Sequence, residues 1–345
     1  MKIEIRTSRD TWNSCLDQFP DFPGKAYYRF EYCALAEANG EGKAKALYYK
    51  NETGSVFYPL LFRQVPEKLS SNKLLDLESP YGYGGPIFSN YHPDLINAFH
   101  KAHHDFCLET DIIAEFVRLN PFVRNHEAYQ SLNCIESNRT TVQINVEGAT
   151  LSDIYAKASP AKRRNLKKAI ASGLTYRKCT PGEFLTCYLQ TMKNLGADNY
   201  YLFSEEYFAA LADLPEEMCM FRCCETSNGR IAAAAVFLLD ETSMHYHLGG
   251  SVKELLLLRP NDFLMFKAAE EASELKKKLL HLGGGLTNHE NDALFRFKKG
   301  FSNEILPFYI AKIIHQPQIY QQLSERWQKI TGLRPAILLH YHYGV

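Results

Sequence analysis

Long hydrophobic runs are missing from this 345-residue sequence: no segment approaches 18 uninterrupted apolar residues, and the opening MKIEIRTSRD contains no apolar signal core. Export and membrane spanning are therefore not expected, and we predict a cytoplasmic protein that has no transmembrane segment, with peripheral membrane contact left open. An excess of one charge is also missing, because 39 acidic residues balance 39 basic ones. DNA is not expected as a partner, and any tRNA contact would rest on a local basic patch.

Sequence motifs for metals and nucleotides are missing as well. The nine cysteines form no CxxC pair and no finger-like histidine spacing accompanies them, so we expect free thiols in a reducing compartment and no metal site. The glycines of His281-Leu-Gly-Gly-Gly285 are followed by neither Gly-Lys-Ser/Thr nor GxGxxG. These omissions exclude a P-loop and a Rossmann phosphate loop.

What the sequence does contain is enough apolar material for two globular domains. Apolar residues make up 46% of the chain and aromatic residues 13%, with 21 Tyr and 21 Phe. In the first half, residues 44–50 and 55–64 are strand-like runs around Asn51-Glu-Thr-Gly54, which predicts a hairpin. We also expect strands over 2–6, 73–78 and 112–119, and helices over 30–38 and 93–107.

The second half repeats this mixture of helices and antiparallel strands. Successive strands are expected over 219–226, 230–240 and 243–249, with turns at Asn228-Gly229 and Asp240-Glu-Thr. The remaining expected elements are helices over 151–171, 181–195, 204–214, 261–278, 292–300 and 318–331, and strands over 174–179, 279–282 and 304–315. The repeated order predicts an α+β fold with mixed sheets, divided into domains 1–148 and 149–345.

Five passages in order along the chain carry a family resemblance. They are Ser79-Pro-Tyr-Gly-Tyr-Gly-Gly-Pro86, Ser159-Pro-Ala-Lys-Arg-Arg-Asn-Leu-Lys-Lys-Ala169, Tyr246-His-Leu-Gly-Gly-Ser251, His281-Leu-Gly-Gly-Gly285 and Leu294-Phe-Arg-Phe-Lys-Lys-Gly-Phe301. Together they resemble the FemAB-like branch of the GNAT superfamily, which includes the transferases that build peptidoglycan cross-bridges. The resemblance implies two tandem GNAT-like domains and an acyltransferase that acylates an amine.

The resemblance also implies the reactants. The donor co-substrate would be aminoacyl-tRNA or acyl-CoA, with no cofactor bound permanently. The acceptor would be a small-molecule or lipid-linked precursor of the cell wall or of a surface polysaccharide. One departure concerns the donor: the acetyl-CoA loop Gln/Arg-x-x-Gly-x-Gly/Ala is missing, and the equivalent place reads Leu258-Arg-Pro-Asn-Asp-Phe263.

Lys298 is the residue that the resemblance singles out for catalysis, in the pair Phe297-Lys298. In cross-bridge transferases the matching lysine is thought to neutralise charge at the reacting carbonyl, and an ammonium in a dry site stabilises such charge strongly. The alternative is a solvated surface lysine beside Lys299. A GNAT sheet also separates two central strands to hold the carbonyl, and we expect these to be 230–240 and 243–249.

Other candidates are assigned to substrate binding. Tyr81, Tyr83 and Gly84 would line the acceptor cleft, or else form only a tight loop. Arg164 and Lys168 share a helix face at i, i+4 and would bind phosphate, or else belong to a solvated basic face with Lys162, Arg163 and Lys167. Asn261 lies at an expected helix N-terminus, which would accept a phosphate of the donor.

His245 and His247 flank Tyr246 on an expected strand and would point to one face of it. Either histidine could take the proton that leaves the amine, or be a hydrogen-bonded core residue, and Tyr246 would contact the substrate. His100 and His104 are taken as surface residues. Two further functions stay open: transfer from acyl-CoA or an acyl carrier to a small amine, and a binding module without catalysis.

Overall fold

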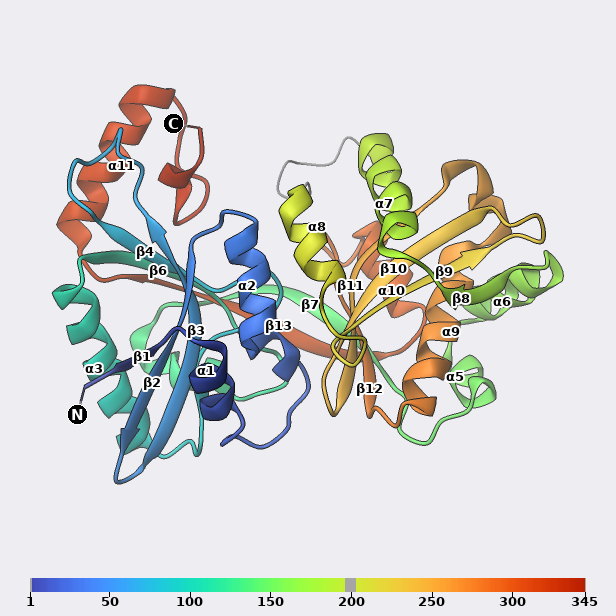
Figure 1. The fold of residues 1–345 in the computed structure, drawn as a ribbon, viewed down its shortest axis with the longest axis horizontal. Helices are drawn as coiled ribbons and strands as arrows, with labels where there is room; N and C mark the ends of the chain where they lie inside the picture. The colour runs from blue at the N-terminus through green and yellow to red at the C-terminus, as the bar shows by residue number, and fades with distance from the viewer. Residues whose placement is uncertain (1, 196–202, 345) are drawn as a thin grey trace. The chain divides into compact units, whose positions relative to one another are not determined.

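The computed structural model describes residues 2–195 and 203–344 (Figure 1). Within these ranges no helix is both long enough and apolar enough to cross a membrane. The chain forms two compact units, each made of a mixed sheet with helices on its faces. The first contains residues 1–20, 27–138 and 308–345, and the second contains residues 21–26 and 139–307.

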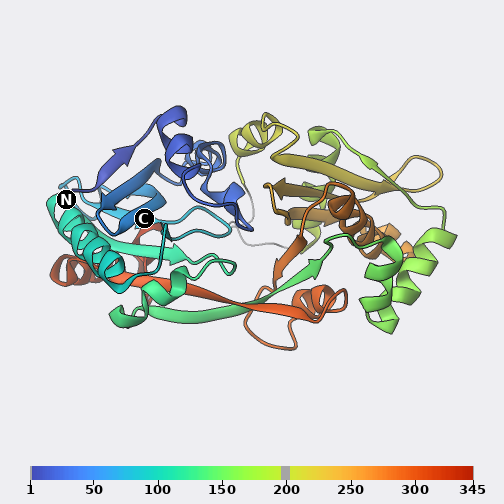
Figure 2. The same cartoon turned by 90° about the horizontal axis from the view of Figure 1, so that it is seen from below.

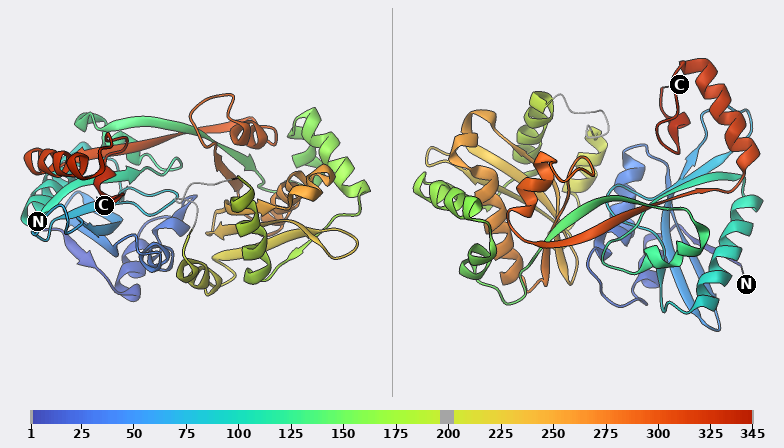
Figure 3. Two further views of the ribbon diagram at one scale, coloured as in Figure 1. Left: turned by 90° about the horizontal axis from the view of Figure 1, so that it is seen from above. Right: turned by 180° about the vertical axis from the view of Figure 1, so that it is seen from behind.

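The first unit has the strand order β1-β2-β3-β4-β6-β13. Its elements are β1 (Glu4–Arg6), α1 (Arg9–Leu16), α2 (Phe30–Ala38), β2 (Lys43–Asn51), β3 (Gly54–Gln64), β4 (Leu75–Glu78), β5 (Ile87–Phe88), α3 (Pro93–Glu109), β6 (Ile112–Arg118), α4 (Asn125–Ala128) and α11 (Pro317–Thr331). Two long strands, β7 (Ile135–Asn145) and β13 (Glu304–Ile314), belong partly to this unit and partly to the second. Figure 3 shows them side by side.

Alternation along β3 explains how both faces of this sheet are covered. Val56 and Tyr58 pack into a core with Leu95 and Phe99 of α3, whereas Phe57 points to the other face, where its ring lies 6.0 Å from that of Trp12 in α1. Figure 2 shows α3 over one side of the strands and α1 and α2 over the other. The expected hairpin is present, with Asn51 opposite Gly54 at its turn.

The second unit has the strand order β7-β12-β11-β10-β9-β8. Its elements are α5 (Leu151–Lys157), α6 (Pro160–Ala171), β8 (Thr175–Lys178), α7 (Pro181–Leu195), α8 (Glu205–Ala212), β9 (Cys219–Glu225), β10 (Ile231–Leu239), β11 (Ser243–Ser251), α9 (Pro260–Glu274), β12 (Leu279–Gly284) and α10 (Ala293–Lys299). Phe237 of β10 shares a core with Phe263 and Phe266 of α9, and α7 packs on β10 and β11.

Three expectations need correction. The single helix over 151–171 is two helices, because the Ser159 side chain caps α6 and Pro160, at its first position, cannot continue a preceding helix. Strand β7 was not expected at all. The compact units also differ from the division 1–148 and 149–345, since β13 carries the chain back and residues 308–345 pack with the first unit.

Candidate active site

The sheet of the second unit opens between β11 and β12. These parallel strands pair over Ser243–His245 and Leu279–His281; beyond those residues β11 pairs with β10 as far as Ser251, and β12 pairs with β7 as far as Gly284. The expected separation of 230–240 from 243–249 is therefore wrong. Those two strands form a continuous antiparallel hairpin, and the separation lies one strand further along.

Lys298 lies at the end of β12, on the short helix α10. Its side chain is buried, and Nζ donates a hydrogen bond of 2.7 Å to the carbonyl oxygen of Gly284. Burial, together with the positive charge of Arg139, lowers the pKa of Lys298 to about 7, with Asp292 partly opposing both. The reading of Lys298 as a solvated surface lysine is excluded, whereas Lys299 is exposed.

The loop between β12 and α10 is fixed by the Asp292 carboxylate. It caps α10 by accepting from the Phe295 backbone N–H at 2.8 Å, and it also accepts from the backbone N–H groups of Leu286 and Thr287. Arg139 donates to the carbonyl of Gly285 at 2.6 Å. The chain at the end of β12 therefore presents two successive carbonyls to two cations, Lys298 and Arg139.

Gly284 has no room for a side chain, which makes it a sensitive probe of this loop. A Cβ there would lie 2.9 Å from Arg139 Cδ and 2.9 Å from the backbone oxygen of Thr140, which cannot move cheaply. We expect Gly284→Ala to lower the free energy of unfolding by about 1–3 kcal/mol and to reduce kcat by displacing the carbonyl that holds Lys298. The matched control is Gly182→Ala, where nothing lies within 4 Å; chemical denaturation of both variants tests the difference.

Tyr246 is the predicted substrate residue that the structure places beside Lys298. Its ring centroid lies 5.6 Å from Lys298 Nζ, and burial raises the pKa of its phenol to about 12. A Cβ on Gly249 would lie 2.1 Å from the Tyr246 hydroxyl, so only glycine leaves space for this ring. Phe297, the other half of the predicted pair, is half-buried and contacts a different lysine, Lys162.

The two histidines do not suit proton transfer at neutral pH. Burial lowers the pKa of His245 to about 4 and that of His247 to about 3. Nε2 of His245 bonds to Ser243 Oγ at 2.8 Å, and Nε2 of His247 bonds to the Tyr207 hydroxyl at 2.7 Å. The pairing of β11 with β10 also skips His247, so the side chains of β11 do not simply alternate between the two faces of the sheet at this point. Both behave as hydrogen-bonded core residues.

A buried ion pair that sequence reasoning missed lies at the start of α9. Asp262, in the first turn, accepts hydrogen bonds from Lys162 Nζ at 2.7 Å and from Asn165 Nδ2 at 3.2 Å. Lys162 Nζ also lies 3.4 Å from the Phe297 ring centroid and 4.2 Å from that of Phe301. A carboxylate thus already lies at the helix N-terminus expected to bind phosphate, where Asn261 donates instead to Ser251 Oγ at 3.1 Å.

The basic side chains of α6 therefore differ in their exposure. Lys162 points inward to Asp262, whereas Arg164 and Lys168 are exposed on α6. Among the ion pairs found within residues 2–195 and 203–344, none involves Arg164 or Lys168. Their exposure is compatible with phosphate binding and equally with a solvated basic face, so phosphate binding by Arg164 and Lys168 stays a prediction.

Tyr81, Tyr83 and Gly84 belong to the first unit and form a well-bonded loop. The Tyr83 ring packs edge-on against Tyr27 and Phe308, at centroid distances of 5.3 Å and 5.2 Å. The Gly84 carbonyl accepts from the Tyr28 hydroxyl at 2.7 Å and from Asn125 Nδ2 at 2.8 Å. These contacts support the reading of a structural loop for Gly84, while Tyr81 and Tyr83 are half-buried.

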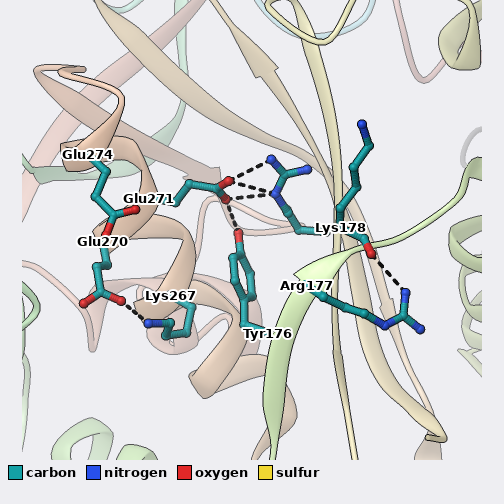
Figure 4. A pocket seen from close by; sticks show the side chains of 8 residues that line it. Tyr176, Arg177, Lys178, Lys267, Glu270, Glu271 and Glu274 are labelled. Carbon is teal, nitrogen blue, oxygen red and sulfur yellow. Dashed lines mark hydrogen bonds and ion pairs between the residues drawn. The ribbon is translucent and has the colours of Figure 1, made fainter.

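A surface pocket of about 440 Å³ lies elsewhere in the second unit, between β8, β9 and α9. Figure 4 shows Glu271 of α9 beside Tyr176, and the guanidinium of Arg222 in β9 bonds to the same carboxylate. Nη2 of Arg222 donates to Glu271 Oε1 at 2.7 Å, and the Tyr176 hydroxyl donates to Glu271 Oε2 at 2.5 Å. Because these polar groups are engaged with one another, the pocket has the character of a structural ion-pair network.

Comparison with known proteins bears on the fold that carries this site. The model of the acetyltransferase (GNAT) domain matches residues 160–299. The crystal structure of FemX superposes with a TM-score of 0.68 at 12% identity, covering 93% of this chain and 99% of that one. No curated protein sequence matches the chain.

Two further solved structures share the fold. L-PGS from Bacillus licheniformis has a TM-score of 0.53 at 11% identity, covering 94% of this chain and 97% of that one. The C-terminal domain (DUF2156) of a putative lysylphosphatidylglycerol synthetase from Agrobacterium fabrum has a TM-score of 0.55 at 13% identity, covering 88% and 90%. The mixed α/β fold predicted from the motifs is confirmed: residues 160–299 match the acetyltransferase (GNAT) domain, and the chain shares its fold with FemX and L-PGS.

Proposed function

We propose that this protein transfers an aminoacyl or acyl group from an activated donor to an amine of a cell-wall precursor or amino sugar. The observation that carries the proposal is the placement of Lys298. Its ammonium is buried beside Tyr246, where β11 and β12 separate. A buried cation at an open sheet edge is a suitable group to stabilise the oxyanion that forms during acyl transfer.

In the proposed reaction the acceptor amine attacks the donor carbonyl, which lies between the separated strands. The carbonyl π electrons move onto oxygen, and the Lys298 ammonium faces the resulting negative charge. The bond to the leaving group then breaks, and the proton lost by the amine nitrogen reaches the leaving oxygen or sulfur through solvent, which releases a tRNA hydroxyl or a CoA thiol. The new amide bond completes the transfer.

The start of α9 favours an aminoacyl donor over acyl-CoA. A CoA pyrophosphate would meet the carboxylate of Asp262 in the first turn of α9, and that carboxylate is already bonded to Lys162. Arg164 and Lys168 are exposed on α6 and offer a local basic patch for the phosphates of tRNA. Tyr81 and Tyr83 stay proposed contacts of the acceptor.

A mass-spectrometric screen of donors against acceptors tests the proposal. The intact chain would be incubated with charged tRNA or with acyl-CoA thioesters, each against amine-bearing wall precursors and amino sugars. We expect a mass increment on one acceptor with charged tRNA, its loss in Lys298→Met, and its retention in the neighbouring control Lys299→Met. Equal turnover by wild type and Lys298→Met would remove the role of Lys298, and increments from acyl-CoA alone would reverse the choice of donor.

The pH dependence of transfer separates two roles for Lys298. If the ammonium stabilises the oxyanion, kcat/KM falls as pH rises through about 7, the pKa to which burial lowers Lys298. A neutral amine acting as a general base would give the opposite slope. We expect the falling limb, and we expect Lys298→Arg to lose it, because a guanidinium stays charged throughout this range. Initial rates between pH 6 and 9 at low substrate concentration measure both profiles.

A further inference from the structure

The first unit contains a cluster of four buried side chains that have no part in the proposed transfer. His103 and Cys107 lie one turn apart on the same face of α3, Glu115 lies on β6, and His315 directly follows β13. One ligand atom from each residue can be chosen so that all four atoms lie within 4.8 Å of one another. These are an imidazole pair, a thiol and a carboxylate, which are the donor types that zinc binds in proteins.

The distances within the cluster suit a tetrahedral ion. Nε2 of His315 lies 3.1 Å from Glu115 Oε2, Nε2 of His103 lies 3.5 Å from the same oxygen, and Cys107 Sγ lies 3.7 Å from His103 Nε2. Zinc bonds of about 2.0–2.3 Å in tetrahedral geometry separate neighbouring ligand atoms by roughly 3.3–3.8 Å. These three distances therefore lie within a few tenths of an ångström of that arrangement.

The same contacts are inconsistent with a catalytic triad. In such a triad the imidazole bridges nucleophile and carboxylate through its two different nitrogens. Here Cys107 and Glu115 both approach Nε2 of His103. Glu115 is fully buried and His103 is only 4% exposed, so a substrate could not reach the thiol.

Groups around the cluster orient two of the four ligands, Glu115 and His315. The Tyr58 hydroxyl donates to Glu115 Oε1, which leaves Oε2 directed at the two histidines. Nδ1 of His315 lies 3.3 Å from Nδ1 of His104, so that Nε2 is the nitrogen facing the cluster. Hydrogen bonds of this kind to the far side of a ligand are typical of metal sites.

We propose that His103, Cys107, Glu115 and His315 bind one Zn²⁺ ion, which fixes α3 against β6 and the end of β13. On binding, a bond forms from each ligand atom to the metal, and the Cys107 thiol gives its proton to solvent. The resulting thiolate and the Glu115 carboxylate together neutralise the two charges of the ion inside the core. With four protein ligands the site is closed, as structural zinc sites are. This proposal departs from the prediction of no metal site, which rested on short sequence spacings.

Metal analysis of the purified full-length chain tests this proposal without any assay of transfer. After expression with added zinc, elemental analysis is expected to find about one zinc per chain. The metal-free protein titrated with Co²⁺ is expected to develop the thiolate-to-cobalt charge-transfer band and the visible bands of a tetrahedral site. Cys107→Ser should lose the charge-transfer band, and the control Cys33→Ser, which alters another fully buried thiol of the same unit, should keep it.

Two results would overturn the zinc site. One is folded wild-type protein with far less than one zinc per chain and no cobalt band, which would make the cluster a hydrogen-bonded polar network only. The other is an equal cobalt spectrum in Cys107→Ser and Cys33→Ser, which would place the metal elsewhere. Should Cys107→Ser fail to fold, the wild-type cobalt spectrum and a zinc-dependent rise in Tm of about 5 °C or more decide the matter.

Discussion

Replacing Lys298 with methionine is expected to remove most acyl transfer and, at the same time, to stabilise the fold. The activity falls because the variant has no cation to meet the oxyanion, and the loss of one such donor typically lowers kcat by about 10²–10³-fold. The stability rises because methionine has a similar length and no charge to bury. A residue that improves stability when removed is one that the fold retains for function.

The expected gain in the free energy of unfolding follows from the lowered pKa of Lys298. Burial lowers the pKa of Lys298 from 10.5 to about 7, which corresponds to roughly 5 kcal/mol of cost for the charged form at low pH. Removing the charge would relieve this cost, but the loss of the hydrogen bond to the Gly284 carbonyl lowers the resulting gain in stability by about 1–3 kcal/mol. We therefore expect Lys298→Met to raise the free energy of unfolding by about 2–4 kcal/mol at pH 7.

The lowered pKa of Lys298 also fixes the direction in which stability changes with pH. The folded state holds its lysine proton less tightly than the unfolded state, so wild-type stability from this group falls as pH drops from 10.5 towards 7. The advantage of Lys298→Met is expected to be largest near pH 7 and to shrink as pH rises to 9.5. Urea denaturation at several pH values measures it, with Lys299→Met as the control that changes neither quantity. A destabilised Lys298→Met variant would contradict the assignment.

Breaking the buried pair between Lys162 and Asp262 is expected to give the largest loss of stability among the changes considered. Asp262→Ala leaves the Lys162 ammonium, which is 6% exposed, without its carboxylate. Removing one partner of a buried pair typically costs about 3–5 kcal/mol. The aromatic rings of Phe297 and Phe301 retain part of the interaction with the cation, so we expect a loss near the lower end.

A double-mutant cycle isolates the pair from its surroundings. Lys162→Met combined with Asp262→Ala removes both charges, and we expect the double variant to be more stable than Asp262→Ala alone. The exposed pair of Lys178 and Glu216, at 2.7 Å, supplies the control; Lys178→Met is expected to change stability by less than about 1 kcal/mol. Additive effects of the two charge removals would show that Lys162 and Asp262 are not coupled.

Elements set by local sequence could be predicted, whereas their long-range pairing could not. The hairpin of β2 and β3 follows from its turn residues, and α3 begins at Pro93 as expected. The separated strands were misplaced because neighbours in sequence, β10 and β11, are joined by a tight turn and must pair. The opening can occur only where a helix connects parallel strands, as α9 connects β11 and β12.

The site shows the same limit at the level of single residues. Lys298 was proposed from its motif, but its hydrogen bond to the Gly284 carbonyl and the nearby charge of Arg139 involve positions that no local pattern connects to it. Lys162 had the appearance of a surface residue because its partner Asp262 lies 100 positions away. The zinc cluster combines positions 103, 107, 115 and 315, and only the return of β13 brings the last of them near the others.

The path of β13 has a consequence for the order in which the protein is made. The first unit needs residues 308–345 to add a strand and the helix α11, and the ribosome produces them only after the whole second unit. The second unit can therefore fold during translation. In the first unit, the edge of β6 stays unpaired until β13 has been synthesised. In this chain the portion synthesised first is the portion completed last.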